Sequence, residues 1–111
     1  ADEIRACLHI GHPQDDQASD LFQVVRRLVL RAGPEELEGW SCHAEDAWAF
    51  LLALLAEGRR ALRRQVCAAA ARLATSEAWA RALRSDCLRA QADALPADAR
   101  RMFEEATQSP A

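Results

Sequence analysis

The residues of this chain best suited to chemistry are its cysteines and histidines, and several of them lie in two short groups. Cys7, His9 and His12 lie close together, and Cys42 is followed directly by His43. Thiolate and imidazole are the usual ligands of structural zinc, which takes four of them in a tetrahedron. The Cys-x-His spacing and the adjacent Cys-His pair are too tight for chelation by an ordinary turn. We therefore expect no metal site and no cofactor.

A cysteine nucleophile would need a histidine base brought to it from elsewhere in the chain. Adjacent Cys42 and His43 cannot form that pair on a regular helix, where neighbouring side chains diverge by about 100°. The sequence has no lysine, no tyrosine and only four glycines, which excludes a Schiff-base amine and makes a glycine-rich phosphate loop a poor expectation. We expect a protein that is not an enzyme and has no catalytic residues. A small metal- or thiol-dependent enzyme is the second alternative.

All fourteen basic residues are arginines, and four of them follow one another closely. Arg59, Arg60, Arg63 and Arg64 occupy positions i, i+1, i+4 and i+5, so on a helix they form two stacked pairs on one surface. Like charges one turn apart repel, so either acids of the same chain, with Glu57 nearest in sequence, or an external anion must compensate them. Guanidinium groups bind carboxylates and phosphates through paired hydrogen bonds, which makes this surface suited to an acidic partner.

Two further features are candidates for partner binding. Arg26, Arg27 and Arg31 form a second, smaller basic group. Trp40 lies beside a glycine and before a polar break, so we expect it to be partly exposed and able to anchor a partner. The predicted partner-binding residues are Arg59, Arg60, Arg63, Arg64, Trp40, Arg27 and Arg31.

The elements that must position these residues are predicted to be helices almost throughout, because apolar residues recur at helical spacing and never alternate. A short helix is expected over residues 3–10. A longer one, with Asp15, Asp16 or Ser19 as its N-cap, is expected to run to about Ala32, where Gly33-Pro34 stops it. Pro34 is placed to open a short helical turn over 35–40. Residues 44–57 are apolar nearly all round, which is typical of a buried helix, so we expect the central helix there.

Three helices are predicted after Gly58. The first has Leu62, Val66, Ala70 and Leu73 on one face, which indicates an amphipathic helix. Ser76 is the expected N-cap of the next helix. Its apolar face is predicted to hold Trp79, Leu83, Cys87, Ala90 and Ala94. Pro96 then opens a last helix that runs to about Ala106.

These patterns together predict an all-α fold, a compact bundle of six or seven short helices around a buried central helix at about residues 44–57. A chain of 111 residues supports one hydrophobic core. We therefore expect a single helical domain over 1–111 with an ordered core over about 19–106, excised from a larger protein.

Charge and composition narrow the partners further. The net charge of −3 argues against the strongly basic balance of a nucleic-acid-binding domain. No run of 18 apolar residues occurs, so no membrane span is expected. The four scattered cysteines favour reduced thiols in an intracellular protein, with two disulfides in a secreted bundle as the alternative.

We therefore expect an adaptor or scaffold domain in the cytoplasm or nucleus, active in protein–protein interaction. Its partner would be an acidic or amphipathic helical peptide of another protein, bound in an inter-helix groove, on the arginine-rich surface, or on both. A nucleic-acid-binding or regulatory domain that uses the same arginines is the first alternative. A homodimer is also compatible with such a bundle.

Overall fold

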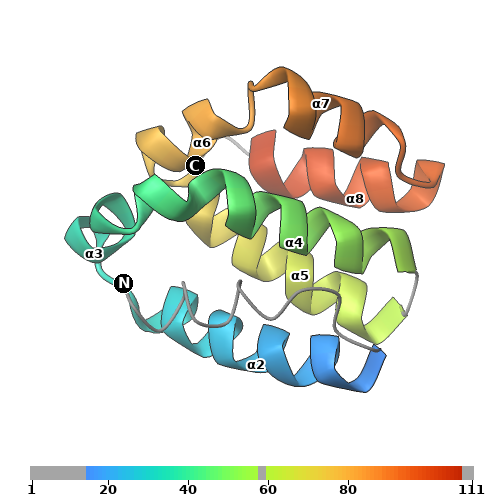
Figure 1. Cartoon of the computed structure of the whole chain (residues 1–111), viewed down its shortest axis with the longest axis horizontal. Helices are drawn as coiled ribbons and strands as arrows, with labels where there is room; N and C mark the ends of the chain where they lie inside the picture. Colours follow the sequence, from blue (N-terminus) through green and yellow to red (C-terminus); the bar gives the residue numbers. More distant parts are fainter. Residues whose placement is uncertain (1–14, 58–59, 109–111) are drawn as a thin grey trace.

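The computed structural model describes residues 15–57 and 60–108 of the chain, so the helix expected over 3–10 lies outside the described residues. Within these ranges the backbone forms seven α-helices, one short 3₁₀-helix and no strand, which confirms the all-α bundle. In chain order these are α2 (Asp15–Arg31), α3 (Pro34–Gly39), η1 (Ser41–His43), α4 (Ala44–Glu57), α5 (Arg60–Ala74), α6 (Glu77–Ala82), α7 (Asp86–Asp93) and α8 (Ala97–Gln108) (Figure 1).

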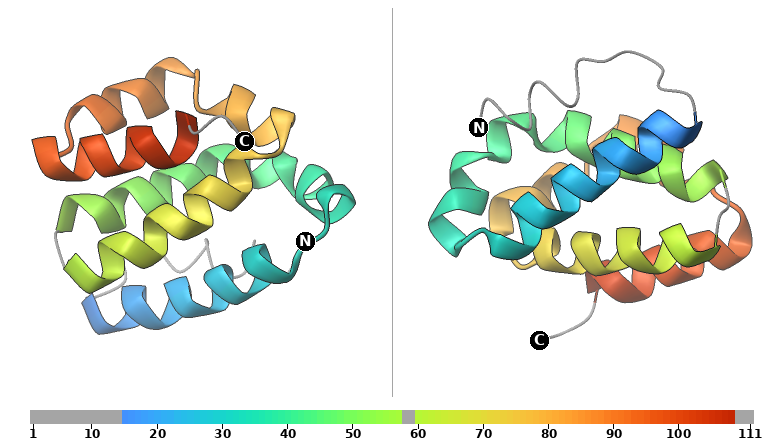
Figure 2. Two further views of the ribbon diagram at one scale, coloured as in Figure 1. Left: turned by 180° about the vertical axis from the view of Figure 1, so that it is seen from behind. Right: turned by 90° about the horizontal axis from the view of Figure 1, so that it is seen from below.

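The helices are arranged around α4 and α5. Helix α5 packs between α2 and α8, and α4 packs on α5 with α6 and α7 as its other neighbours. The colours in Figure 1 and Figure 2 show that α2, α5 and α8 run in one direction while α4 runs in the opposite direction. No helix in the described ranges combines the length and the apolar character that a bilayer crossing requires.

The predicted central helix is confirmed, with the bounds expected from the sequence. Half of the residues of α4 are buried, including Trp48, Leu51 and Leu55. Its apolar residues extend round most of its circumference because α5 covers one side and α6 and α7 cover others. Acidic residues stand only at its two ends, where water solvates them.

Three aromatic rings form the part of the core that joins α4, α6 and α8. The ring of Trp48 meets Trp79 edge to face at a centroid distance of 6.0 Å and Phe103 at 5.8 Å. The indole nitrogen Nε1 of Trp48 donates a hydrogen bond of 2.9 Å to the carbonyl of Trp79. A buried indole N–H needs such a partner, because its water is lost on folding.

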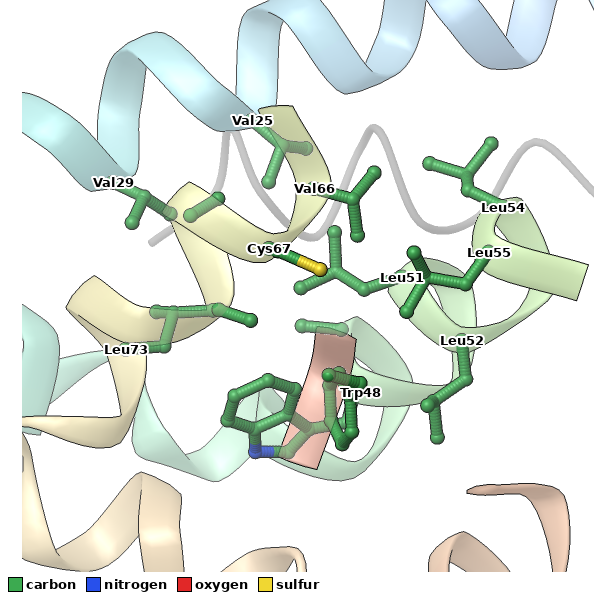
Figure 3. Close-up of a cluster of buried hydrophobic side chains, with 14 of the residues drawn as sticks. Val25, Val29, Trp48, Leu51, Leu52, Leu54, Leu55, Val66, Cys67 and Leu73 are labelled. Carbon is green, nitrogen blue, oxygen red and sulfur yellow. The ribbon is translucent and has the colours of Figure 1, made fainter. Parts of the chain in front are cut away.

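Aliphatic side chains fill the space between α2, α4 and α5 (Figure 3). The predicted face of α5 is confirmed, since Val66, Ala70 and Leu73 are buried and Leu62 is half-buried. Cys67 lies beside them, and its sulfur points into the apolar cluster.

The helix boundaries follow local chemistry. Pro34 is the first residue of α3, where its missing N–H leaves no backbone bond unmade. Ser76 occupies the N-cap position of α6 as expected, but its side chain makes no capping hydrogen bond. Helix α8 begins after Pro96 and runs to Gln108, two residues beyond the expected end.

The prediction of one continuous helix after Ser76 is wrong, because the chain forms α6 and α7 with a turn between them. Ser85 lies in extended backbone, and its hydroxyl accepts a hydrogen bond of 3.4 Å from the N–H of Leu88. This cap starts a new helix with a different apolar side, on which Leu88 is buried; Leu95, which follows the end of α7, is buried as well. The residues that were expected on the apolar face beyond this turn are exposed, namely Cys87, Ala90 and Ala94.

Candidate interaction surface

The four arginines of the predicted patch are described unequally by the structure. Arg59 lies outside the described residues, and Arg60 begins α5 but its side chain is not described. The side chains of Arg63 and Arg64 are described, and they differ in their surroundings. Arg64 is exposed and Arg63 is half-buried, because consecutive residues on a helix diverge by about 100°.

The Nε atom of the half-buried Arg63 is itself buried and has no hydrogen-bond partner among the described residues. Cys67 follows Arg63 by one helical turn, and both burial and the charge of Arg63 affect the pKa of its thiol. Burial raises the pKa of the Cys67 thiol above its ordinary value, and the positive charge of Arg63 offsets part of that rise. Arg63 is therefore less exposed than Arg64. The predicted pairs Arg59–Arg63 and Arg60–Arg64 stay predictions, because one side chain of each pair lies outside the described residues.

Two polar contacts tie α2 to α5. Gln23 Nε2 donates to Gln65 Oε1 at 2.7 Å, and Arg72 Nη2 donates to the carbonyl of Ala32 at 2.6 Å. The second contact satisfies a backbone carbonyl that follows the end of α2, where no further helical turn supplies a donor. The two helices are thereby fixed side by side, as Figure 1 shows.

Three exposed arginines lie along this pair of helices. Arg27 lies one turn after Gln23 on α2, Arg31 lies one turn further, and Arg64 directly precedes Gln65 on α5. All three side chains are exposed. We call Arg27, Arg31 and Arg64 the basic surface. Arg26 lies next to it but is half-buried, with Nη1 donating to Gln23 Oε1 at 3.5 Å.

Two apolar side chains accompany the basic surface. Val24 is 45% exposed and Leu30 is 46% exposed, and they are the exposed large hydrophobic residues of the described chain. Each is three residues from Arg27 on α2, so they flank it on the helix surface. The outer side of α2 therefore presents apolar and basic groups together.

Arginines and acids are concentrated on different helices, the arginines on α5 and the acids on α3 and the start of α4. Helix α5 carries four arginines and no acid. Residues 35–46, which span α3, η1 and the start of α4, carry five acids and no arginine. We call these exposed acids the acidic surface, formed by Glu35, Glu36, Glu38, Glu45 and Asp46. Four of them lie in the first turns of α3 and α4, where the helix dipole stabilises negative charge.

Ion pairs do not neutralise these surfaces within the described residues. There, only Arg81 and Glu77 form an ion pair, with Nη2 and Oε1 separated by 3.2 Å on the exposed side of α6. The sequence pattern predicts these acids at helix ends and does not by itself predict that they form one surface. The feature that indicates the surface is the occurrence of five acids and no arginine over residues 35–46.

Trp40 is half-buried, as expected, and packs against the core at the end of α3. Its backbone N–H donates to the carbonyls of Glu36 at 3.0 Å and Leu37 at 3.2 Å, which closes α3. Helix α3 lies at the opposite end of the bundle from the start of α5 (Figure 1). The structure thus separates Trp40 from Arg64 and places it beside the acidic surface instead.

An open cleft of about 460 Å³ lies where α3 meets the turn between α5 and α6. Glu38 and Glu77 are exposed at its rim, and Arg72 on its wall is already bonded to Ala32. The lining residues are Pro34, Leu37, Glu38, Arg72, Thr75, Ser76, Glu77 and Ala78. The cleft mixes apolar, acidic and hydroxyl groups, so it differs from the apolar inter-helix groove considered for a peptide helix.

The cysteine and histidine groups are only partly covered by the structure. Cys7, His9 and His12 lie outside the described residues. Cys42, Cys67 and Cys87 are free thiols, of which only Cys67 is buried. Across residues 15–57 and 60–108, the structure brings together no group of three or more His, Cys, Asp or Glu side chains that could hold a metal ion.

No family model matches this chain, and no curated protein or solved structure matches it either.

Proposed function

We propose that this domain is a non-enzymatic protein-interaction module whose basic surface binds an acidic helical segment of another protein. One observation carries the proposal. Arg27, Arg31 and Arg64 are exposed along the α2–α5 pair, and none of them pairs with a carboxylate among the described residues. Guanidinium groups in this state are available for paired hydrogen bonds to carboxylates of a partner.

The apolar neighbours of these arginines favour a protein partner over a nucleic acid. Val24 and Leu30 supply apolar area that an amphipathic helix can cover, and an acidic residue beside its apolar side would meet Arg27. A polyphosphate chain would gain nothing from those side chains. It would also be repelled by the chain's net charge of −3 and by the five acids over residues 35–46.

A fixed platform lowers the cost of binding. The Gln23–Gln65 and Arg72–Ala32 hydrogen bonds hold α2 and α5 in place before any partner arrives. Little backbone entropy is then lost on association, and the cost is confined to ordering the arginine side chains. In this proposal the domain acts as an adaptor or scaffold within an intracellular protein of the cytoplasm or nucleus.

A titration of the 111-residue chain distinguishes the ligand classes. Three fluorescent probes are compared by anisotropy at about 0.15 M salt: an acidic amphipathic helical peptide, the same peptide with every Glu replaced by Gln, and an oligonucleotide. We expect the acidic peptide to bind about tenfold or more tightly than either other probe, since each charged hydrogen bond contributes on the order of 1.5–3 kcal/mol. Equal binding of the neutral peptide, or tighter binding of the oligonucleotide, would overturn the proposal.

A further inference from the structure

The acidic partner that the basic surface requires is also present on this chain itself. Glu36 and Glu38 are exposed on α3, and the acids of the first turn of α4 extend the same charged region. We propose that the acidic surface of one copy binds the basic surface of a second copy. This inference rests on the proposed function, because it uses the same arginines and names their partner.

The two surfaces match in the kinds of group they carry. The basic surface combines three arginines with the exposed Val24 and Leu30. The acidic surface combines five carboxylates with the exposed ring of Pro34 and the half-buried Trp40. Each surface therefore combines charges of one sign with apolar side chains, the two kinds of group that protein interfaces pair.

The location of Arg64 favours its pairing with an acid of another copy. Arg31, the last residue of α2, lies close to α3 in the chain, but it forms no ion pair with the acids of α3 among the described residues. Arg27 lies in the middle of α2 and Arg64 near the start of α5, whereas Glu38 lies at the end of α3. Helix α3 is at the far end of the bundle from the start of α5 in all three views (Figure 1, Figure 2). Hydrogen bonds to the helix ends and the packed core hold these elements apart, so Glu38 of one copy meets Arg64 only in another copy.

The negative net charge does not prevent this association. At physiological ionic strength the screening length is about 8 Å, so a charge senses mainly the groups directly opposite it. Two copies that each carry −3 then repel weakly at a distance, while facing carboxylates and guanidinium groups attract strongly at contact. Self-association should accordingly weaken as salt is added.

Mixing two charge-neutralised variants tests the proposal. Arg27→Gln with Arg31→Gln removes most of the basic surface, and Glu36→Gln with Glu38→Gln removes part of the acidic surface. Sedimentation velocity of the full chain should show salt-sensitive association of the wild type and a monomer for each variant alone. An equimolar mixture should form a 1:1 complex, since each variant retains the surface that the other has lost. If either variant were misfolded, the mixture would not regain the association that each variant alone has lost.

Matched controls lie on α8, where exposed arginines and glutamates belong to neither surface. Arg100→Gln with Arg101→Gln changes the net charge as the arginine test variant does, and Glu104→Gln with Glu105→Gln changes it as the glutamate test variant does. Both controls should associate as the wild type does. A wild type that remains monomeric at low salt, or a mixture of the two test variants that stays monomeric, would overturn the inference.

The acidic-peptide titration separates this failure from failure of the proposed function. If the wild type is monomeric but binds the acidic peptide, and Arg27→Gln with Arg31→Gln abolishes that binding, the arginines serve another protein and only self-association is refuted. If neither a second copy nor the acidic peptide binds, both proposals are refuted.

Discussion

The indole N–H of Trp48 on α4 donates to the backbone carbonyl of Trp79 on α6 at 2.9 Å, and the two rings meet edge to face. Trp79 in turn donates its own indole N–H to the carbonyl of Leu37 at 2.5 Å. Two tryptophans thus connect α4, α6 and α3 in series. Because α3 carries three of the acids of the acidic surface, this relay also holds that surface in place.

Replacing Trp79 by Phe should destabilise the domain by about 3 kcal/mol. The variant loses packing volume beside Trp48 and the indole hydrogen bond to the carbonyl of Leu37, which then keeps only the 3.2 Å bond from the N–H of Trp40. Urea denaturation followed by circular dichroism gives the free energy of unfolding. Trp40→Phe is the matched control, and it should cost less than about 1 kcal/mol because Trp40 is half-buried and its indole N–H makes no hydrogen bond to a described residue. Equal losses for the two variants would contradict this account.

Two serines at helix starts give a second paired test. Ser85→Ala should cost about 1 kcal/mol of stability, since the hydroxyl accepts the N–H of Leu88 at the start of α7. Ser76 occupies the same position before α6 but caps nothing with its side chain, so Ser76→Ala should cost less than about half as much. The comparison uses thermal or urea unfolding under one set of conditions. A larger loss for Ser76→Ala would show that the capping assignment is wrong.

The central helix and the break at Ser85 show how far this fold can be predicted from the sequence. The central helix over 44–57 could be predicted residue by residue, because its apolar run is long and ends at charged residues and a glycine. The break at Ser85 could not, because the surrounding Leu, Arg and Ala residues all favour helix. Burial of Leu88 and Leu95 against α4 and its neighbours decides that break, and such contacts depend on the tertiary structure.

The candidate site was predictable only in part for a similar reason. Arg27 and Arg31 were expected to be surface residues, and the structure places both in solvent. Arg63 and Arg64 were expected on one surface, but Arg63 is half-buried and Arg64 is exposed, a difference that depends on how α5 packs against its neighbours. Sequence spacing places residues on one face of a helix without specifying which face is covered. Trp40 was correctly expected to be partly exposed, yet its separation from Arg64 follows from the arrangement of α3 and α5.

Arg72 is predicted to stabilise the junction between α2 and α5. Its guanidinium satisfies the carbonyl of Ala32 and places positive charge near the C-terminal end of α2, where the helix dipole favours it. Arg72→Gln should lower the free energy of unfolding by about 1–2 kcal/mol, while Arg89→Gln at an exposed position of α7 should change it by less than about 0.5 kcal/mol. Amide hydrogen exchange in the last turn of α2 should accelerate only in the Arg72 variant. Unchanged exchange there would argue against this role.

Alkaline pH should destabilise the domain through Cys67. Burial keeps the pKa of this thiol above its ordinary value of 9.0, so the thiol of the unfolded chain ionises first as the pH rises. The stability that Cys67 contributes is therefore complete below about pH 9.0 and is lost as the pH rises through the folded-state pKa. The chain has no lysine or tyrosine, so few other side chains titrate in this range.

The free energy of unfolding measured against pH checks this expectation. It should fall less steeply above about pH 9.0 in Cys67→Ala than in the wild type, and Cys87→Ala should follow the wild type because Cys87 is exposed. Parallel curves for the wild type and Cys67→Ala would contradict the assignment.

The central claim is that Arg27, Arg31 and Arg64 form a binding surface for carboxylates of a protein. The most direct measurement is the dissociation constant of the acidic helical peptide for two variants of equal charge, Arg27→Gln with Arg31→Gln, and Arg100→Gln with Arg101→Gln. The first pair should weaken binding about tenfold or more and flatten its salt dependence, whereas the second should change the constant less than about twofold. Equal weakening by the two pairs would mean that only net charge matters, and the claim of a defined surface would fall.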